Sequence, residues 1–167
     1  MTFTNYSNFD STLKLTKAVP ITVAAFKRLD ANDQLGLLWE IYQRMEQEGW
    51  IAVATLGTAR LKLAQGLLHQ IKLMSFSEQL QAMRDLLNKI NTPITRAYGL
   101  FRNNKLVFWH QLATLIGSGE VVPVPADYKL SPAATEVFNQ VMLLDFGRKV
   151  QFLRRVVADL GVDPMAI

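Results

Sequence analysis

Few side chains in this sequence have the types and spacing needed for acid–base, nucleophilic or metal chemistry. The chain has no cysteine and two histidines, His69 and His110, and it contains no H-E-x-x-H pair, no P-loop and no G-x-G-x-x-G after a strand. We expect His69 to be a partly buried helix histidine. His110 follows Trp109 on the most apolar predicted helix and is a candidate pocket-lining residue. Two histidines without an obvious carboxylate partner make a poor metal site, so we predict neither a metal site nor an enzyme.

Aromatic side chains stand beside predicted kinks and connectors. They are Trp39 and Tyr42 on one predicted helix, Trp50 in a connector, Trp109 on another helix, and Tyr128 after a proline-rich segment. Aromatic stripes usually belong to the core. The alternative is a long apolar slot, lined by rings and methionine, for a large hydrophobic ligand. Composition does not decide between these two interpretations.

The elements that must position these rings are helices. Short polar residues that accept hydrogen bonds from first-turn amides precede most of the apolar-periodic stretches. They predict helix starts at Pro20 with Thr22, Asp30, Thr58, Ser75, Thr92 with Pro93, Ser131 with Pro132, and Asp145. No strand is convincing, so we predict an all-α fold.

Two stretches define the middle of this predicted fold. Leu106 to Ile116 is apolar around most of its circumference, which predicts a central helix. Gly117 to Lys129 contains two prolines and two glycines, which predict an irregular segment. Elsewhere Leu80, Met83, Leu87 and Ile90 have the spacing of a buried helix stripe, and no repeat with a period of about 20 to 50 residues is present.

Composition and charge describe one folded domain over residues 1–167. The chain is 50% apolar and 19% charged, with a formal net charge of +4. Its basic residues are interspersed with acids, so no nucleic-acid-binding arm is predicted. The longest uncharged stretch, 106–119, is too short and too polar to cross a bilayer, so we do not expect an integral membrane protein. The amino terminus lacks a secretory signal, which predicts a cytoplasmic location.

Several segments carry a more specific pattern. They are Phe26-x-x-Leu29-x-Ala31-x-Asp33-Gln34-Leu35-x-Leu37-x-Trp39-x-x-Tyr42, Gln81-Ala82-Met83-x-Asp85-Leu86, Asn91-Thr92-Pro93, Arg96-x-Tyr98, Phe108-Trp109, Val124-Pro125-x-x-Tyr128-x-Leu130-Ser131 and Val150-x-x-Leu153-Arg154-x-Val156-Val157-x-Asp159-x-Gly161. Together they resemble, in order along nearly the whole chain, the amino-terminal domain of the cyanobacterial orange carotenoid protein family. The sequence stops where the linker and carboxy-terminal domain of that family would begin, so it looks like a free-standing helical carotenoid protein.

The resemblance implies two interleaved four-helix bundles with one keto-carotenoid, such as canthaxanthin or echinenone, held non-covalently in a central tunnel between them. The candidate carotenoid-binding residues are Leu35, Leu38, Trp39, Tyr42, Leu80, Met83, Leu106, Trp109, His110, Val124, Pro125, Tyr128, Val150, Gln151, Arg154, Val157 and Leu160.

The resemblance implies a photoprotective function with two alternatives. In the first, the carotenoid protein quenches singlet oxygen by itself. In the second, it docks on the phycobilisome at the cytoplasmic face of the thylakoid and releases antenna excitation energy as heat, or pairs with a separate homologue of the family's carboxy-terminal domain. Arg154 is the candidate residue for recognising such a partner, and the alternative for Arg154 is an ordinary solvated basic helix face.

Overall fold

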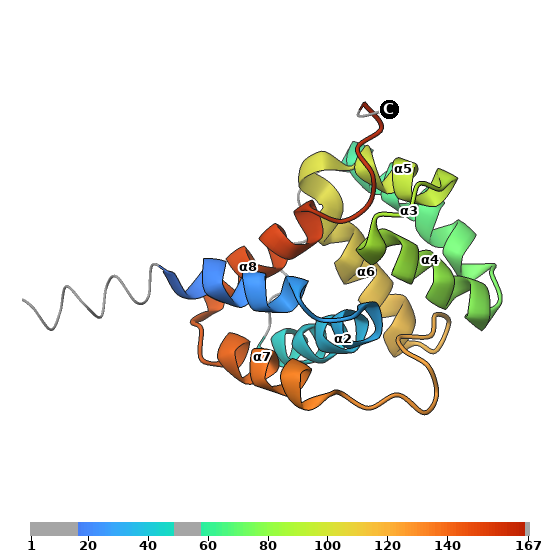
Figure 1. Ribbon diagram of the computed structural model, residues 1–167. Helices are drawn as coiled ribbons and strands as arrows, with labels where there is room; N and C mark the ends of the chain where they lie inside the picture. The colour runs from blue at the N-terminus through green and yellow to red at the C-terminus, as the bar shows by residue number, and fades with distance from the viewer. Residues whose placement is uncertain (1–16, 49–57, 166–167) are drawn as a thin grey trace, which may run out of the picture.

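The computed structural model describes residues 17–48 and 58–165, and these residues form helices and connecting segments without a strand (Figure 1). A first helix covers 17–27. It is followed by α2 (Ala31–Gln47), α3 (Thr58–Lys72), α4 (Phe76–Asn88), α5 (Pro93–Gly99), the short 3-10 helix η2 (Arg102–Asn104), α6 (Lys105–Gly117), α7 (Pro132–Met142) and α8 (Phe146–Ala158). The predicted all-α class is confirmed.

The helix starts follow from short polar side chains. The residues before α2, α4, α5, α7 and α8 each accept a hydrogen bond from the amide three positions further on, and they are Asp30, Ser75, Thr92, Ser131 and Asp145. Each such cap satisfies one first-turn amide and is worth about 1 kcal/mol to the helix. All five starts agree with the prediction, because the type and spacing of the capping residues identify them in the sequence.

The first helix does not start where the sequence indicates. It already includes Lys17, so Pro20 and Thr22 do not open it. The hydroxyl of Thr22 donates to the carbonyl oxygen of Ala18 at 2.7 Å. A threonine inside a helix satisfies its hydroxyl in this way without acting as a cap.

Two further local predictions are wrong. Helix α4 ends at Asn88 because Lys89 adopts a left-handed conformation with φ of 56°. Ile90 therefore leaves the buried stripe and is 50% exposed. His69, expected to be partly buried, is exposed on α3. Ile90 is exposed because the helix ends before it, whereas His69 lies within α3 on a face that no neighbouring element among the described residues covers.

The helices pack as two bundles. The first helix, α2, α7 and α8 form one, and α3, α4, α5 and α6 form the other. The chain enters the second bundle after α2 and returns to the first after α6, so the two four-helix bundles are interleaved, as predicted. Helix α6 runs through the middle of the molecule (Figure 1) and packs against both α3 and α8, while α2 packs against both α7 and α4.

The two bundles are built from similar halves of the chain. Identical residues recur 70 positions apart at Trp39 and Trp109, Phe76 and Phe146, Gln81 and Gln151, and Arg84 and Arg154. The helix-capping residues Ser75 and Asp145 have the same separation. Exchanging α2, α3 and α4 with α6, α7 and α8 preserves the main helix pairs, since α2–α7 becomes α6–α3 and α2–α4 becomes α6–α8. This reciprocal pairing is typical of two-fold-related units, and it places Trp39 and Trp109 at equivalent positions.

Candidate functional site

A narrow apolar pocket lies between α2, α4 and α6, where the two bundles meet. About 280 Å³ of free space lies among its side chains, a volume that includes space open to solvent. Its lining consists of Leu35, Leu38, Trp39 and Tyr42 from α2, Met83 from α4, Trp109, Ala113 and Ile116 from α6, and Pro123 from the segment after α6. The structure thus brings together six of the predicted binding residues from three helices that are distant in sequence.

The lining is chemically suited to an apolar, flat ligand. The side chains of Trp109 and Tyr42 are only 4% and 3% exposed, and Trp39 is partly buried. Burial raises the pKa of the Tyr42 phenol well above its ordinary value, so the phenol stays neutral. Indole and phenol rings offer planar surfaces, and the thioether of Met83 adapts to an irregular shape. None of the nine lining residues carries a formal charge.

The other predicted residues lie outside this lining. Four are buried in the core: Leu106, Val150, Val157 and Leu160. Five are partly buried: Leu80, His110, Val124, Pro125 and Tyr128. Gln151 and Arg154 are exposed on α8. The predicted connector residue Trp50 lies outside the described residues.

His110 is the one predicted lining residue with an ionisable imidazole. It is partly buried on α6 next to Trp109. Burial lowers the pKa of its imidazole below the ordinary value, although the nearby Glu46 acts in the opposite direction. His110 is therefore mostly neutral at pH 7, which suits a position close to an apolar pocket.

Sequence reasoning missed three lining residues. Ala113 and Ile116 follow Trp109 by four and seven positions and therefore lie on the same face of α6. This spacing is sufficient to identify Ala113 and Ile116 once Trp109 is assigned to the lining of the pocket. Pro123 belongs to the irregular segment, where no periodicity relates one residue to the next.

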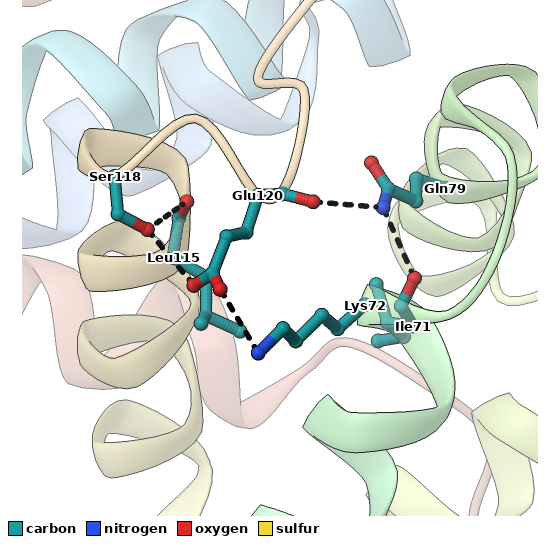
Figure 2. Close-up of polar contacts among 6 residues, drawn as sticks. All are labelled: Ile71, Lys72, Gln79, Leu115, Ser118 and Glu120. Atoms are coloured by element: carbon teal, nitrogen blue, oxygen red, sulfur yellow. Dashed lines mark hydrogen bonds and ion pairs between the residues drawn. The ribbon is translucent and has the colours of Figure 1, made fainter.

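The segment that carries Pro123 is tied down on one side by Gln79, as Figure 2 shows. Gln79 is fully buried on α4, and its amide nitrogen donates to the carbonyl oxygens of Ile71 and Glu120, both at 3.1 Å. Its side-chain oxygen accepts from the amide of Val122 at 3.0 Å. The Glu120 carboxylate also pairs with Lys72 at 2.9 Å (Figure 2). Because a buried amide left unpaired costs about 1 to 3 kcal/mol, this cluster fixes where the segment leaves α6.

The far side of the same segment is tied to α2 by Asp33. Its buried carboxylate accepts hydrogen bonds from the hydroxyl of Tyr128 and, at 2.7 Å, from the hydroxyl of Ser131. Gly36, one turn further on, allows the Tyr128 ring to approach, since a Cβ there would lie 2.7 Å from it. The segment from Val122 to Ser131 is therefore anchored at both ends and forms a fixed border of the pocket.

Protonation of the Asp33 carboxylate should weaken the hydrogen bonds that hold this segment to α2. Burial alone raises the pKa of the carboxyl, but hydrogen bonds from Tyr128 and Ser131 outweigh it and leave the pKa below the ordinary value of 3.8. A carboxyl with a lowered pKa stabilises the fold above its ordinary pKa, and that stability is lost as the pH falls through the lowered value.

We therefore expect Asp33→Asn to lower the free energy of unfolding by roughly 1.5 to 3 kcal/mol at neutral pH, the range for hydrogen bonds to a charged group. The difference from the unaltered protein should shrink as the pH falls below 3.8. Urea denaturation of both proteins over this range measures it. Comparing the two proteins removes the contribution of other carboxyls, and a difference that stays constant with pH contradicts the assignment.

Two general site types are not found in the part of the chain that the structure describes. Residues 17–48 and 58–165 hold no cluster of three or more potential metal-ligating His, Asp or Glu side chains. Among the same residues, no helix is both long enough and apolar enough to traverse a bilayer.

The fold and the pocket together define the class of protein. It is an all-α protein whose uncharged aromatic pocket, between two interleaved helical bundles, suits a flat apolar ligand. The model of the family described as "Orange carotenoid protein, N-terminal" matches residues 12–163. The chain therefore belongs to the orange carotenoid protein N-terminal family, and the resemblance predicted from the sequence is confirmed.

The relatives are cyanobacterial. The chain is 51% identical over 150 residues to an orange carotenoid-binding domain-containing protein of Nostoc sp. PCC 7120, covering 89% of this chain and 86% of that protein. It is 40% identical over 144 residues to the orange carotenoid-binding protein of Synechocystis sp. PCC 6803, covering 86% of this chain and 45% of the relative. The chain thus spans about half the length of the Synechocystis protein.

Solved structures are also similar. The Orange Carotenoid Protein of Anabaena (Nostoc) sp. PCC 7120 binding canthaxanthin matches with a TM-score of 0.80 and 42% identity, over 88% of this chain and 47% of that one. The Red Carotenoid Protein of the same organism, also binding canthaxanthin, matches with a TM-score of 0.73 and 32% identity, over 86% of this chain and 98% of that one.

Proposed function

We propose that this protein binds one keto-carotenoid non-covalently and protects against photodamage by quenching singlet oxygen. The observation that carries the proposal is the pocket at the bundle seam, where Trp39, Tyr42 and Trp109 converge in a family whose solved members bind canthaxanthin. Echinenone, which has similar rings, is an equally suitable ligand.

The dimensions of the pocket limit what it holds. The room inside it for water-sized molecules is about 10 Å³, well below the roughly 300 to 1,000 Å³ that is typical of ligand pockets, so binding a ring requires the lining side chains to move apart. A carotenoid is a rod on the order of 30 Å long, comparable with the hydrocarbon thickness of a bilayer. We therefore propose that the pocket takes one end of the ligand, and that the polyene continues between the bundles towards the predicted residues of α6 and α8, among them Leu106, Val150 and Arg154.

The protein's part in this function is physical. A bound carotenoid supplies a conjugated chain that accepts excitation energy from singlet oxygen and releases it as heat. Trp39 and Trp109 provide planar walls, and each offset ring contact adds about 0.5 to 1.5 kcal/mol beyond burial. Met83 and the leucines of α2 exclude water. No residue acts as an acid, base or nucleophile in this proposal, so the proposed function is not enzymatic.

The experiment is a measurement of singlet-oxygen lifetime. Singlet oxygen is generated by a dissolved sensitiser, and its infrared emission is followed in the presence of pigment-loaded and pigment-free protein. We expect the loaded protein to shorten the lifetime in proportion to its concentration and well beyond the pigment-free protein. Equal quenching by the two forms would contradict the proposed function, even if the pigment is bound.

A second candidate function is docking on the phycobilisome, with loss of antenna fluorescence. The observation that favours it is the basic surface of α8, where Arg154 and Arg155 are exposed and form no ion pair within the described residues. A separate homologue of the family's carboxy-terminal domain would meet the same surface. Titrating the pigment-loaded protein into isolated phycobilisomes separates the candidates, because unchanged fluorescence leaves singlet-oxygen quenching alone.

A further inference from the structure

Trp109, which lines the pocket, is hydrogen-bonded to a buried tyrosine. Its indole nitrogen donates a hydrogen bond to the hydroxyl oxygen of Tyr98 at 2.9 Å. Tyr98 is fully buried on α5, and its hydroxyl donates in turn to the carbonyl oxygen of Val157 at 2.7 Å. Every partner in this chain of bonds is buried, so losing one bond leaves another group unsatisfied. The orientation of the pocket wall is thereby connected to the last turn of α8.

The segment that follows α8 is fitted against the same tyrosine. Gly161 has φ of +74°, and a Cβ there would lie 2.5 Å from a ring carbon of Tyr98. The amide of Gly161 donates to the carbonyl oxygen of Leu86 at 2.9 Å, and the amide of Val162 donates to that of Thr95 at 3.2 Å. Backbone hydrogen bonds to α4 and α5 thus hold this segment in contact with the Tyr98 ring.

Lys105 contacts both the end of α8 and the Tyr98 ring. Its ammonium group donates to the carbonyl oxygens of Ala158 at 2.8 Å and Leu160 at 3.1 Å. It also lies 5.1 Å from the centre of the Tyr98 ring, within cation–π range. The carbonyl groups at the end of α8, which have no helical partner, are therefore satisfied by a side chain that covers Tyr98.

The other half of the molecule offers an internal comparison. Trp39 occupies the equivalent position 70 residues earlier and lines the same pocket. Among the described residues, no group forms a hydrogen bond with the Trp39 indole. One of the two equivalent tryptophans is thus tied to the end of α8 and the other is not.

We propose that Tyr98 is a positioning residue that couples the segment 157–162 to the pocket wall. When that segment moves, the Trp109 indole loses its fixed orientation, while Trp39 keeps its own. The coupling gives a contact made at the exposed end of α8 a route to the ligand site. Its ligand-related consequence rests on the proposed function, but the coupling itself is a property of the protein without pigment.

The experiment follows the indole N–H signals of Trp39 and Trp109 by nuclear magnetic resonance in the pigment-free chain of residues 1–167. Trp39→Phe and Trp109→Phe variants assign the signals. In Tyr98→Phe, which keeps the ring packing, we expect the Trp109 signal to move by several times the displacement of Trp39. Its hydrogen exchange should also accelerate about fivefold, which corresponds to the loss of a hydrogen bond worth about 1 kcal/mol.

A second variant tests the route from the end of α8. Lys105→Met keeps the apolar stem but removes the bonds to Ala158 and Leu160 together with the cation–π contact to the Tyr98 ring. It keeps both groups of the Trp109–Tyr98 hydrogen bond. We expect it to move the Trp109 signal and leave Trp39 in place. The matched control is Lys129→Met, an exposed lysine without a hydrogen bond among the described residues, which should move neither signal.

Three outcomes overturn the proposal. An unmoved Trp109 signal in Tyr98→Phe shows that the hydrogen bond does not hold the indole. Movement in Tyr98→Phe but not in Lys105→Met shows that Tyr98 is a local partner and not a link to the end of α8. Equal movement of both tryptophans in Lys105→Met indicates general loosening. Because no pigment is present, each outcome is distinguishable from a failure to bind carotenoid.

Discussion

Replacing Ala113 by phenylalanine should prevent carotenoid binding in a protein that still folds. Ala113 is partly buried on α6 and lines the pocket between Trp109 and Ile116. A phenyl ring projecting from this position would occupy the space that the ligand needs. Clashes that weaken binding by as little as 1.4 kcal/mol reduce the affinity tenfold, so we expect pigment loading to fall by at least about tenfold.

The measurement is the ratio of visible to ultraviolet absorbance after purification from carotenoid-producing cells. Ala133→Phe is the matched control, because Ala133 is exposed on α7 and does not line the pocket. It should load pigment normally. Circular dichroism of both variants reports the helical fold. Normal pigment loading of Ala113→Phe would show that the ligand lies elsewhere.

The second large effect concerns stability. Gly161→Ala should lower the free energy of unfolding by roughly 2 to 4 kcal/mol. About 1 kcal/mol comes from the positive φ of +74°, which an L residue tolerates poorly. The rest comes from the Tyr98 ring, which lies 2.5 Å from the new Cβ, since overpacking of this kind typically costs about 1 to 3 kcal/mol.

Gly119→Ala separates the two contributions. Gly119 has φ of +80°, but no atom lies within 4 Å of a Cβ built there. This variant should therefore show the conformational cost alone, about 1 kcal/mol. Urea denaturation gives both values. Equal destabilisation by the two substitutions would mean that the segment after α8 is not packed against Tyr98.

Much of the fold follows from local chemistry that is visible in the sequence. Ser75 and Thr92 mark helix starts because their hydroxyls satisfy amides three residues away, and such bonds need no information from the rest of the chain. The aromatic wall was also visible, since Trp39 and Trp109 stand on strongly apolar faces. Local patterns therefore identified the helices and the main rings that line the pocket.

What the sequence did not show depends on contacts between distant elements. Gln79 reads as an ordinary polar helix residue, yet it is fully buried and joins α4 to the connection after α6. Tyr98 reads as a core aromatic, and its bonds to Trp109 and Val157 become apparent only when α5, α6 and α8 are assembled. The 70-residue correspondence was present in the sequence but lies outside the shorter periods that indicate repeats.

The central claim is that the seam between the bundles holds a carotenoid, and the visible absorption spectrum of the protein made in cells that accumulate canthaxanthin tests it most directly. We predict a coloured protein with about one pigment molecule per chain and an absorption band shifted from that of the free pigment, as expected for one rod-shaped ligand held in a single site. A folded but colourless protein would contradict the claim.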